Sequence, residues 1–243
     1  MKILYLPQEQ DHEIGTVLSL PREDSHHITH VLRLPAGARL AVSDGRQWVY
    51  TAELMIESAP KRVALRLLKR SAIDKPRHRL HLHLSPVPKP IAEDLLRRAA
   101  EWGITSLEWT LYERSEIFWE YAKVASRFEK VTQEAIKSTG RPLVPTLTSP
   151  ILFREAMAHT ADAGLHLFGH IHPQGAQTLA ALDLVDVADC HLWIGPQGDF
   201  TQHERETMTA AGYVPITLGR YIYRIESAAA IFIIQLQSRL AGL

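Results

Sequence analysis

Ile194-Gly195-Pro196-Gln197-Gly198-Asp199-Phe200 and Leu218-Gly219-Arg220-Tyr221-Ile222-Tyr223-Arg224-Ile225-Glu226-Ser227-Ala228 are the two stretches that decide the fold of this 243-residue chain. Each follows a short apolar run typical of a buried strand, and each leads toward a predicted helix. Glycines at such strand-to-helix turns let bare backbone come close to a ligand. Because open α/β sheets bind ligands at the carboxyl ends of their strands, we expect the two turns to form one pocket.

The composition is that of an ordinary globular protein, with 46% hydrophobic and 22% charged residues. The formal net charge is zero, so charge alone does not indicate a nucleic-acid binder. The sequence has no apolar run long enough to span a bilayer, and its N-terminus lacks the apolar core of a signal peptide. Cys190 is the only cysteine, which excludes an intrachain disulfide and favours a half-buried thiol over a nucleophile. We therefore expect a cytoplasmic protein without membrane association.

Residues 1–70 are predicted to form a small β-barrel, because turn signals separate several short apolar runs. One helix, over residues 25–33, is expected to interrupt them, with Asp24 or Ser25 as its N-cap. Residues 71–79 form a basic connector, typical of a solvated linker, with RNA contact as the alternative. The predicted strands are Ile3–Leu6, Thr16–Leu20, Arg39–Ser43, Trp48–Met55 and Arg62–Leu68.

From residue 80 onward, strand and helix patterns alternate, which predicts a mainly parallel sheet covered on both faces. The helix expected over Thr201–Ala211 has Thr201 as its N-cap and Glu204 three residues on, the spacing of a capping box. Gly103 is expected to end another predicted helix, Ile91–Trp102. The other predicted elements are the strands Leu80–Leu84, Ile104–Leu111, Leu165–Phe168, His191–Ile194 and Tyr213–Leu218, and the helices Ile91–Trp102, Tyr121–Ser138 and Glu226–Leu240.

Several common catalytic and nucleotide-binding motifs are absent from the sequence. Neither a hydrolase elbow, nor a Walker loop, nor a dinucleotide-binding glycine fingerprint is present. The 13 histidines lack carboxylate or cysteine partners at zinc-like spacing, so we expect no metal site and interpret them as polar surface or capping groups. The histidines that lie close enough in the predicted elements to be candidates for a metal site are His26, His27, His30, His81, His83, His166, His170 and His172.

Arg224 and Glu226 stand before an apolar helix, and we expect them at its buried N-terminal end. One interpretation is a structural salt link, with the carboxylate favoured by the helix dipole. The other is a charged pair that faces a ligand pocket. The residues alone leave both open.

These motifs resemble those of the RsmE family of ribosomal RNA uridine methyltransferases, members of the SPOUT class. The family reads Gly-Pro-Glu-Gly-Gly-Phe at the first turn and Leu-Gly-x-x-Ile-Leu-Arg-x-Glu-Thr-Ala at the second. The likeness covers nearly the whole chain. Its other parts, in order, are His26-His27-Ile28-x-x-Val31-Leu32-Arg33-Leu34-x-x-Gly37, Asp44-Gly45, Lys89, Glu101-x-Gly103, Arg114-Ser115, Glu134-Ala135, Gly140-Arg141 and Val144-Pro145.

The resemblance implies a PUA-like β-barrel RNA-binding domain over residues 1–70, a linker over 71–79, and a SPOUT α/β domain with a trefoil knot over 80–243. It also implies a homodimer that uses S-adenosylmethionine to methylate N3 of a uridine in small-subunit (16S) ribosomal RNA. The partner would be that RNA or the assembled small ribosomal subunit.

The resemblance also assigns roles to single residues. Arg224 would stabilise the anion that forms on the uridine ring, and Glu226 would orient Arg224 or manage the proton. The RNA-binding residues would be Lys2, Arg33 and Arg141. The cofactor-binding residues would be Ile194, Gly195, Pro196, Gly198, Leu218, Gly219 and Tyr223.

The chain departs from the family pattern near the expected pocket. Gln197 replaces a glutamate, and Asp199 replaces a glycine. Tyr221 stands where the family usually has arginine, and Tyr223 where it has leucine. Ile136-Lys137-Ser138-Thr139 falls where a Glu-Gln pair is typical. Two alternatives therefore stay open: a SPOUT methyltransferase with a different RNA target, and a non-catalytic ribosome- or RNA-binding protein that kept the fold.

Overall fold

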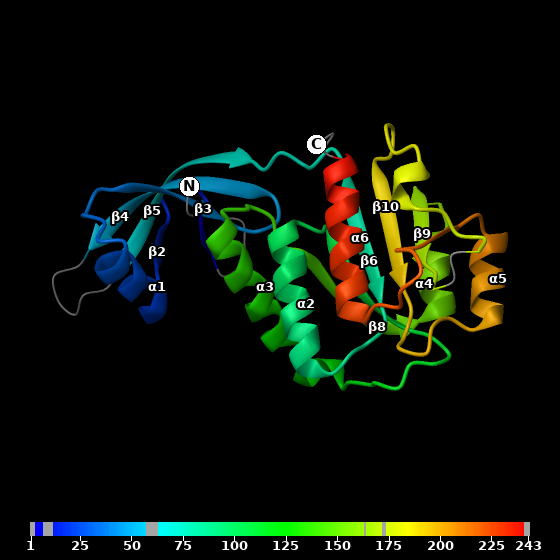
Figure 1. Ribbon diagram of the computed structural model, residues 1–243. Helices are drawn as coiled ribbons and strands as arrows, with labels where there is room; N and C mark the ends of the chain where they lie inside the picture. The colour runs from blue at the N-terminus through cyan, green and yellow to red at the C-terminus, as the bar shows by residue number, and fades with distance from the viewer. Residues whose placement is uncertain (1–2, 7–11, 57–62, 163, 172–173, 241–243) are drawn as a thin grey trace. The chain divides into compact units, whose positions relative to one another are not determined.

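The computed structural model describes residues 3–6, 12–56, 63–162, 164–171 and 174–240 (Figure 1). The chain divides into two compact units. The first comprises Met1–Lys75 together with Ile136–Val144, and the second comprises Pro76–Ala135 and Pro145–Leu243. The segment Ile136–Val144 thus returns to the first unit, which the sequence did not predict.

The first unit is built on a curled five-stranded sheet in the order β1-β3-β4-β5-β2. β1 is parallel to β3, and the other neighbours are antiparallel. Side chains that alternate along β4 and β5, among them Tyr50, Leu54 and Leu65, are fully buried on one face. The strands are β1 (Ile3–Tyr5), β2 (Val17–Ser19), β3 (Arg39–Ser43), β4 (Trp48–Ile56) and β5 (Val63–Ala72).

The helix of the first unit begins earlier than predicted. α1 spans Arg22–His26 and continues as a π-helical turn, η1 (His27–Val31). Its N-cap is Pro21, so the predicted cap at Asp24 or Ser25 is wrong. The acidic pair Glu23 and Asp24 lies in the first turn instead, where the positive end of the helix dipole favours it.

The returning segment Ile136–Val144 is fastened to the sheet by the turn after β3. The hydroxyl of Ser43 donates a hydrogen bond of 2.5 Å to the carbonyl of Pro142. Gly45 has φ of 74°, and a Cβ there would lie 2.6 Å from the side chain of Val144. This close approach requires glycine, which explains the Asp-Gly turn seen in the sequence.

The second unit is built on a six-stranded sheet in the order β11-β9-β10-β6-β7-β8, and every neighbouring pair is parallel. The parallel sheet predicted from the alternating pattern is confirmed. β8 was not predicted, because Pro150 and half-exposed residues obscure its pattern. The strands are β6 (Arg79–Leu84), β7 (Ser106–Leu111), β8 (Thr146–Leu152), β9 (Leu165–Gly169), β10 (Asp189–Ile194) and β11 (Val214–Ile216).

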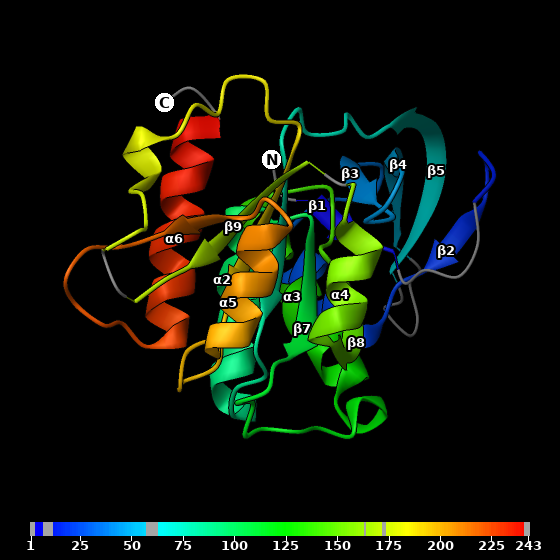
Figure 2. The ribbon, with the colours of Figure 1, turned by 90° about the vertical axis from the view of Figure 1, so that its right-hand side faces the viewer.

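Helices cover both faces of this sheet (Figure 2). α2 (Lys89–Trp102), α3 (Ala125–Thr139) and α6 (Ile225–Leu240) pack on one face, around an aliphatic core that contains Leu82 and Ile233. α4 (Phe153–Thr160) and α5 (Gln202–Ala210) cover the other face with an aromatic cluster around Phe168. The described part of this unit also contains the 3₁₀ turns η2 (Tyr121–Lys123) and η3 (Leu179–Ala181).

Two predicted helix ends are confirmed. The Thr201 side chain accepts a hydrogen bond of 3.2 Å from the backbone N–H of Glu204, whose carboxylate accepts one of 2.8 Å from the N–H of Thr201. Gly103 stops α2 in the left-handed conformation, with φ of 77°. The trefoil knot stays a prediction of the family resemblance.

Cys190 is fully buried in β10, so the expected half-buried thiol is wrong. Burial raises the pKa of this thiol to about 12, which keeps it protonated and unreactive at neutral pH. Within the described ranges, every helix falls short of the length and apolarity needed to cross a bilayer.

Candidate active site

The two glycine turns lie in the wall of one pocket of about 720 Å³, at the carboxyl ends of β9, β10 and β11. This is the edge of a parallel sheet where α/β proteins bind ligands. The volume falls within the range of small-molecule sites. The turns contribute the runs Ile194–Asp199 and Tyr221–Glu226, with Leu218 between them in the chain.

The first turn is held from both sides. Gly195 is buried, and a Cβ there would lie 3.1 Å from the ring of Phe200. On the outer side, Nη1 of Arg114 donates a hydrogen bond of 2.7 Å to the carbonyl of Gly198. Asp199 has φ of 60°, the conformation that the family's glycine would suit, and its carboxylate lies 3.4 Å from Arg205. The turn therefore keeps a glycine-like path despite the substitution.

The second turn is more open. Gly219 has φ of 100°, and its N–H donates to the hydroxyl of Thr217 at 3.2 Å. The loop that follows carries exposed side chains: Tyr221 is 63% exposed, Ile222 75% and Tyr223 40%. All three line the pocket. A loop with so little burial can adjust to a ligand.

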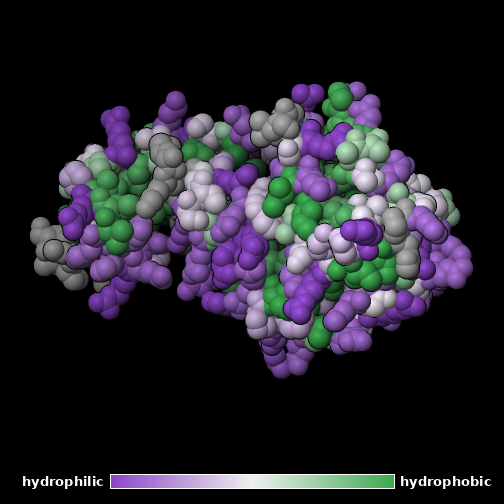
Figure 3. Space-filling model, in the orientation of Figure 1, coloured by the Kyte–Doolittle hydropathy of each residue, from purple (hydrophilic) through white to green (hydrophobic). Residues whose placement is uncertain are grey.

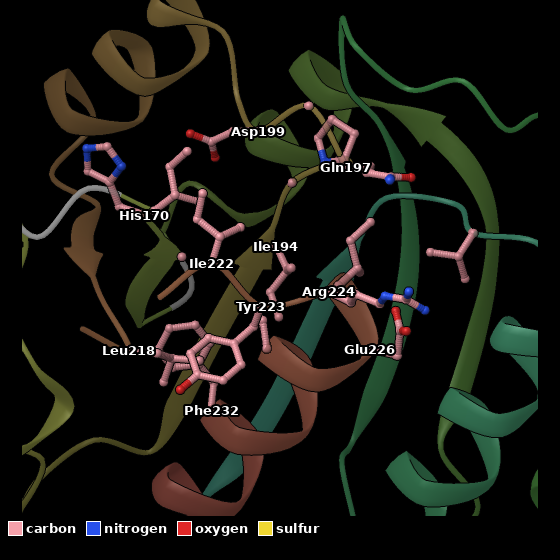
Figure 4. A pocket seen from close by; sticks show the side chains of 18 of the residues that line it. His170, Ile194, Gln197, Asp199, Leu218, Ile222, Tyr223, Arg224, Glu226 and Phe232 are labelled. Atoms are coloured by element: carbon pink, nitrogen blue, oxygen red, sulfur yellow. The ribbon is translucent and has the colours of Figure 1, made fainter. Parts of the chain in front are cut away.

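Arg224 and Glu226 also line the pocket, where the loop enters α6. Figure 4 shows their charged ends pointing toward one another. Glu226 is half-buried in the first turn of α6, but Arg224 is exposed, so its expected burial at the helix end is wrong. The helix begins one residue after Arg224, which leaves the guanidinium directed into the pocket region rather than into the core.

Two further segments complete the wall and were missed in the sequence. Gly169 ends β9 and His170 follows it, whereas Val87 lies in the connection between β6 and α2 and Ile91 in the first turn of α2. A Cβ at Gly169 would lie 3.3 Å from the ring of Phe232 on α6. A glycine directly after a predicted strand was the available signal, since the same pattern marks the other two turns.

Most of the predicted site residues come together, but not all. Gly219 lies in the second turn without being among the residues that line the pocket. Arg33 and Arg141 are exposed and belong to the first unit. Lys2 lies outside the described residues. The predicted residues that line the pocket are Ile194, Gly195, Pro196, Gly198, Leu218, Tyr223, Arg224 and Glu226.

Four histidines gather on the sheet face beneath α4 and α5, where the register places His81, His191 and His166 side by side across β6, β10 and β9. His83 is stacked on Trp193 at 3.8 Å between ring centroids. Burial lowers the pKa of His191 to about 3 and that of His166 to about 4, so both are neutral at pH 7.

The interpretation of these histidines as surface or capping groups is therefore wrong for His83 and His166, which are buried, and His191 is buried as well, in a strand predicted to be buried. The alternation of histidine and leucine along β6 was the signal, because it places the imidazoles on one face of a covered strand. Among the described residues, no three potential ligands group around a metal position.

Comparison with known families identifies the class of protein. Residues 74–237 match the model described as an RNA methyltransferase domain, and residues 20–67 match an RNA methyltransferase PUA domain. The first match covers well over half of the chain. The chain therefore belongs to the RNA methyltransferase family, with the curled sheet of the first unit as its PUA-like part.

Individual relatives narrow the resemblance. The Ribosomal RNA small subunit methyltransferase E of Synechocystis is 24% identical over 61% of this chain, and the match spans 49% of that relative. The crystal structure of a Ribosomal RNA small subunit methyltransferase E from Neisseria gonorrhoeae, bound to S-adenosyl methionine, has a TM-score of 0.81 at 24% identity and covers 98% of both chains. A probable rRNA-methyltransferase from Porphyromonas gingivalis has a TM-score of 0.83 at 25% identity, over 100% of this chain and 99% of its own. The resemblance to the RsmE proteins is confirmed.

Proposed function

We propose that this protein is an S-adenosylmethionine-dependent methyltransferase that modifies N3 of a uridine in small-subunit (16S) ribosomal RNA. The observation that carries the proposal is the pocket itself, in which two glycine turns meet the Arg224–Glu226 pair at one edge of the sheet. The relatives with similar folds are described as ribosomal RNA methyltransferases.

The chemistry of the pocket fits this cofactor. Its inner wall is formed by buried backbone at Gly195 and Pro196, and by apolar side chains such as Ile91 and Phe232. Backbone groups would hold the polar ends of S-adenosylmethionine, and the apolar side chains would contact its adenine. When bound, this cofactor supplies an electrophilic methyl group. The residues that would hold it are Ile194, Gly195, Pro196, Gly198, Leu218, Gly219 and Tyr223.

Arg224 supplies what the acceptor base needs. The N3 atom of uridine carries a proton, and its loss leaves negative charge spread over the ring and its carbonyl oxygens. An exposed guanidinium at the pocket wall would stabilise that charge. Glu226, whose carboxylate points toward Arg224, would keep the guanidinium in position or accept the proton. Much of the remaining rate enhancement would come from alignment of the two substrates.

We also propose two partners: ribosomal RNA, bound by residues of the first unit, and a second copy of the chain, which would contact the exposed face of α6. Arg33, Arg141 and Lys2 would contact phosphates of the ribosomal RNA, either free or in the assembled small subunit. A homodimer would cover apolar surface on α6, where Ile234 is 52% exposed and hydrophobic side chains gather on the surface of the unit (Figure 3). A cytoplasmic location follows from this substrate.

The alternative of a different RNA target is favoured by one observation. Tyr221, which stands where the family usually has arginine, is a pocket residue and not a remote surface residue. A changed side chain at that place could change which RNA segment is accepted. The third alternative is a non-catalytic ribosome- or RNA-binding protein.

Two measurements separate these alternatives. Calorimetry with S-adenosylmethionine tests the cofactor site, and the absence of binding at millimolar concentration would support the non-catalytic protein. Mapping of N3-methyluridine in 16S ribosomal RNA, with and without the gene, tests the target. Loss of one modified uridine on deletion of the gene supports the proposal. If the protein binds S-adenosylmethionine but deletion leaves the N3-methyluridine map of 16S ribosomal RNA unchanged, its target is another RNA.

A further inference from the structure

An exposed aromatic ring stands at the mouth of the pocket, in the loop between β11 and α6. Tyr221 lines the pocket while 63% of its surface is open to solvent. The guanidinium of Arg220 lies 4.9 Å from the centroid of this ring, and Nη2 of Arg220 donates a hydrogen bond of 2.9 Å to the tyrosine hydroxyl. The arginine thus contacts the tyrosine side chain at both the ring and the hydroxyl.

We propose that Tyr221, backed by Arg220, is a stacking platform for a nucleobase of the RNA substrate, an inference that rests on the proposed function. Unpaired RNA bases stack on aromatic side chains and on arginine planes. A ring in cation–π contact with a guanidinium offers both features at once, because it combines a flat apolar surface with a positive charge. That combination suits a base that is attached to a phosphate backbone.

The position of Tyr221 favours the RNA over the cofactor as its ligand. Gly195 and Pro196, which form the inner wall, are buried, whereas Tyr221 and its neighbour Ile222 are the exposed rim. Methyl transfer requires the donor and the acceptor to align in one cavity. The smaller molecule fits the buried part of that cavity, and the base of a long RNA chain must enter over the rim.

The substitution also changes the kind of contact. Where the resembled family usually has arginine, a charged side chain would contact phosphate or a base edge. A tyrosine contacts the face of a base instead. Stacking is tolerant of base identity, so this platform would hold a base in place without selecting it by hydrogen bonds.

The test compares Tyr221→Ala and Tyr221→Phe with the wild-type protein. The substrate is small ribosomal subunits from cells that lack the gene, with methyl-labelled S-adenosylmethionine as donor. We expect Tyr221→Ala to raise the KM for subunits about tenfold, since loss of one base-stacking contact typically weakens affinity by about fivefold to 150-fold. Tyr221→Phe keeps the ring and should retain a KM within about threefold of wild type. Phe118→Ala, which removes an aromatic side chain that is 70% exposed and is not among the pocket residues, is the matched control.

Three results would overturn the proposed stacking platform, and the second and third would each assign the ring another role. An unchanged KM in Tyr221→Ala would mean that the ring touches no RNA. A tenfold loss of S-adenosylmethionine affinity by calorimetry would place the ring on the cofactor. A change of oligomeric state by light scattering would place it between two copies of the chain. Failure of the wild-type protein to transfer any methyl group would instead contradict the proposed function, so the two failures are distinguishable.

Discussion

Arg114, in the loop after β7, donates a hydrogen bond of 2.7 Å from Nη1 to the backbone carbonyl of Gly198 in the first glycine turn. The contact joins two strand-end loops that are 84 residues apart in the chain. Since the same turn forms the inner wall of the pocket, Arg114 restricts the backbone that we propose to hold the cofactor.

Arg114→Ala should therefore weaken S-adenosylmethionine binding without unfolding the protein. The side chain is exposed, so we expect the loss to be about 1 kcal/mol, or roughly fivefold in Kd, which is below the ~1.5–3 kcal/mol typical of a hydrogen bond to a charged group. Isothermal calorimetry measures this directly. Arg154→Ala, an exposed arginine on α4, is the control, and an equal effect in both variants would argue against the contact.

A second prediction concerns the free energy of unfolding and rests on the buried side chain of Glu204. Its carboxylate accepts hydrogen bonds of 2.8 Å from the N–H groups of Glu113 and Thr201. Glu204→Ala would leave both donors without this partner, at a cost of about 2 to 4 kcal/mol in the free energy of unfolding. Urea titration is the measurement. Glu206→Ala, on the exposed side of the same helix, should change stability by less than about 0.5 kcal/mol.

The buried histidines predict acid-sensitive stability. His166 and His191 have folded pKa values of about 4 and 3, below the value of 6.5 of an unperturbed histidine, because burial disfavours the charged ring. The unfolded chain therefore binds more protons between those values and pH 6.5, so stability is complete above pH 6.5 and falls as the pH drops. Each kcal/mol lost lowers the Tm by about 2 to 4 °C.

The carboxylates near this cluster do not cancel the lowering of the pKa values of His166 and His191 by burial. Glu108 bonds Nδ1 of His83, and Asp189 bonds Nε2 of His81, whereas Nδ1 of His191 lies 2.9 Å from Nε2 of His83. His191→Phe should keep a ring in the cluster and flatten the dependence of Tm on pH, whatever it does to stability at pH 8. An unchanged slope between pH 7 and 5 would rule out His191 as a source. His203→Ala, exposed on α5, is the control.

Alanine substitutions at Gly195, in the first turn, and at Gly212, between α5 and β11, should have different effects on cofactor binding. A Cβ at Gly195 would lie 3.1 Å from the buried ring of Phe200, so Gly195→Ala should displace the turn and cost about 1 to 3 kcal/mol of stability. At Gly212, a Cβ would meet nothing within 4 Å, and only its φ of 84° opposes alanine. Gly212→Ala should lower stability by about 1 kcal/mol and leave cofactor affinity unchanged, whereas Gly195→Ala should lower both. Equal cofactor affinities in the two variants would contradict this account of the first turn.

The sequence predicted the elements whose signals are local. The capping box at Thr201 and the stop at Gly103 are read from residues three or four positions apart, and the alternation of strands and helices predicts a parallel sheet. α4 was missed because it begins after Leu152, whose side chain offers no capping oxygen. The start of α1 was misplaced because Pro21 precedes the residues that looked like caps.

What the sequence could not predict depends on strand order. The return of Ile136–Val144 to the first unit pairs Leu143 with Gly45, a contact between residues far apart that no local pattern encodes. The approach of Gly169 to the two glycine turns follows from β9 lying between β11 and β10. The cluster around His191 arises in the same way, because three strands in register place single histidines side by side.

The most direct test of the proposed function is transfer of a labelled methyl group to small ribosomal subunits from cells that lack the gene, comparing the wild-type protein with Arg224→Ala. Loss of one group that stabilises developing charge typically costs about 100- to 1,000-fold in rate. We predict that the wild-type protein methylates N3 of one uridine in 16S ribosomal RNA, and that Arg224→Ala binds S-adenosylmethionine normally but transfers methyl at least about 100-fold more slowly. An equal rate in the variant, or no transfer by a wild-type protein that binds the cofactor, would contradict the account.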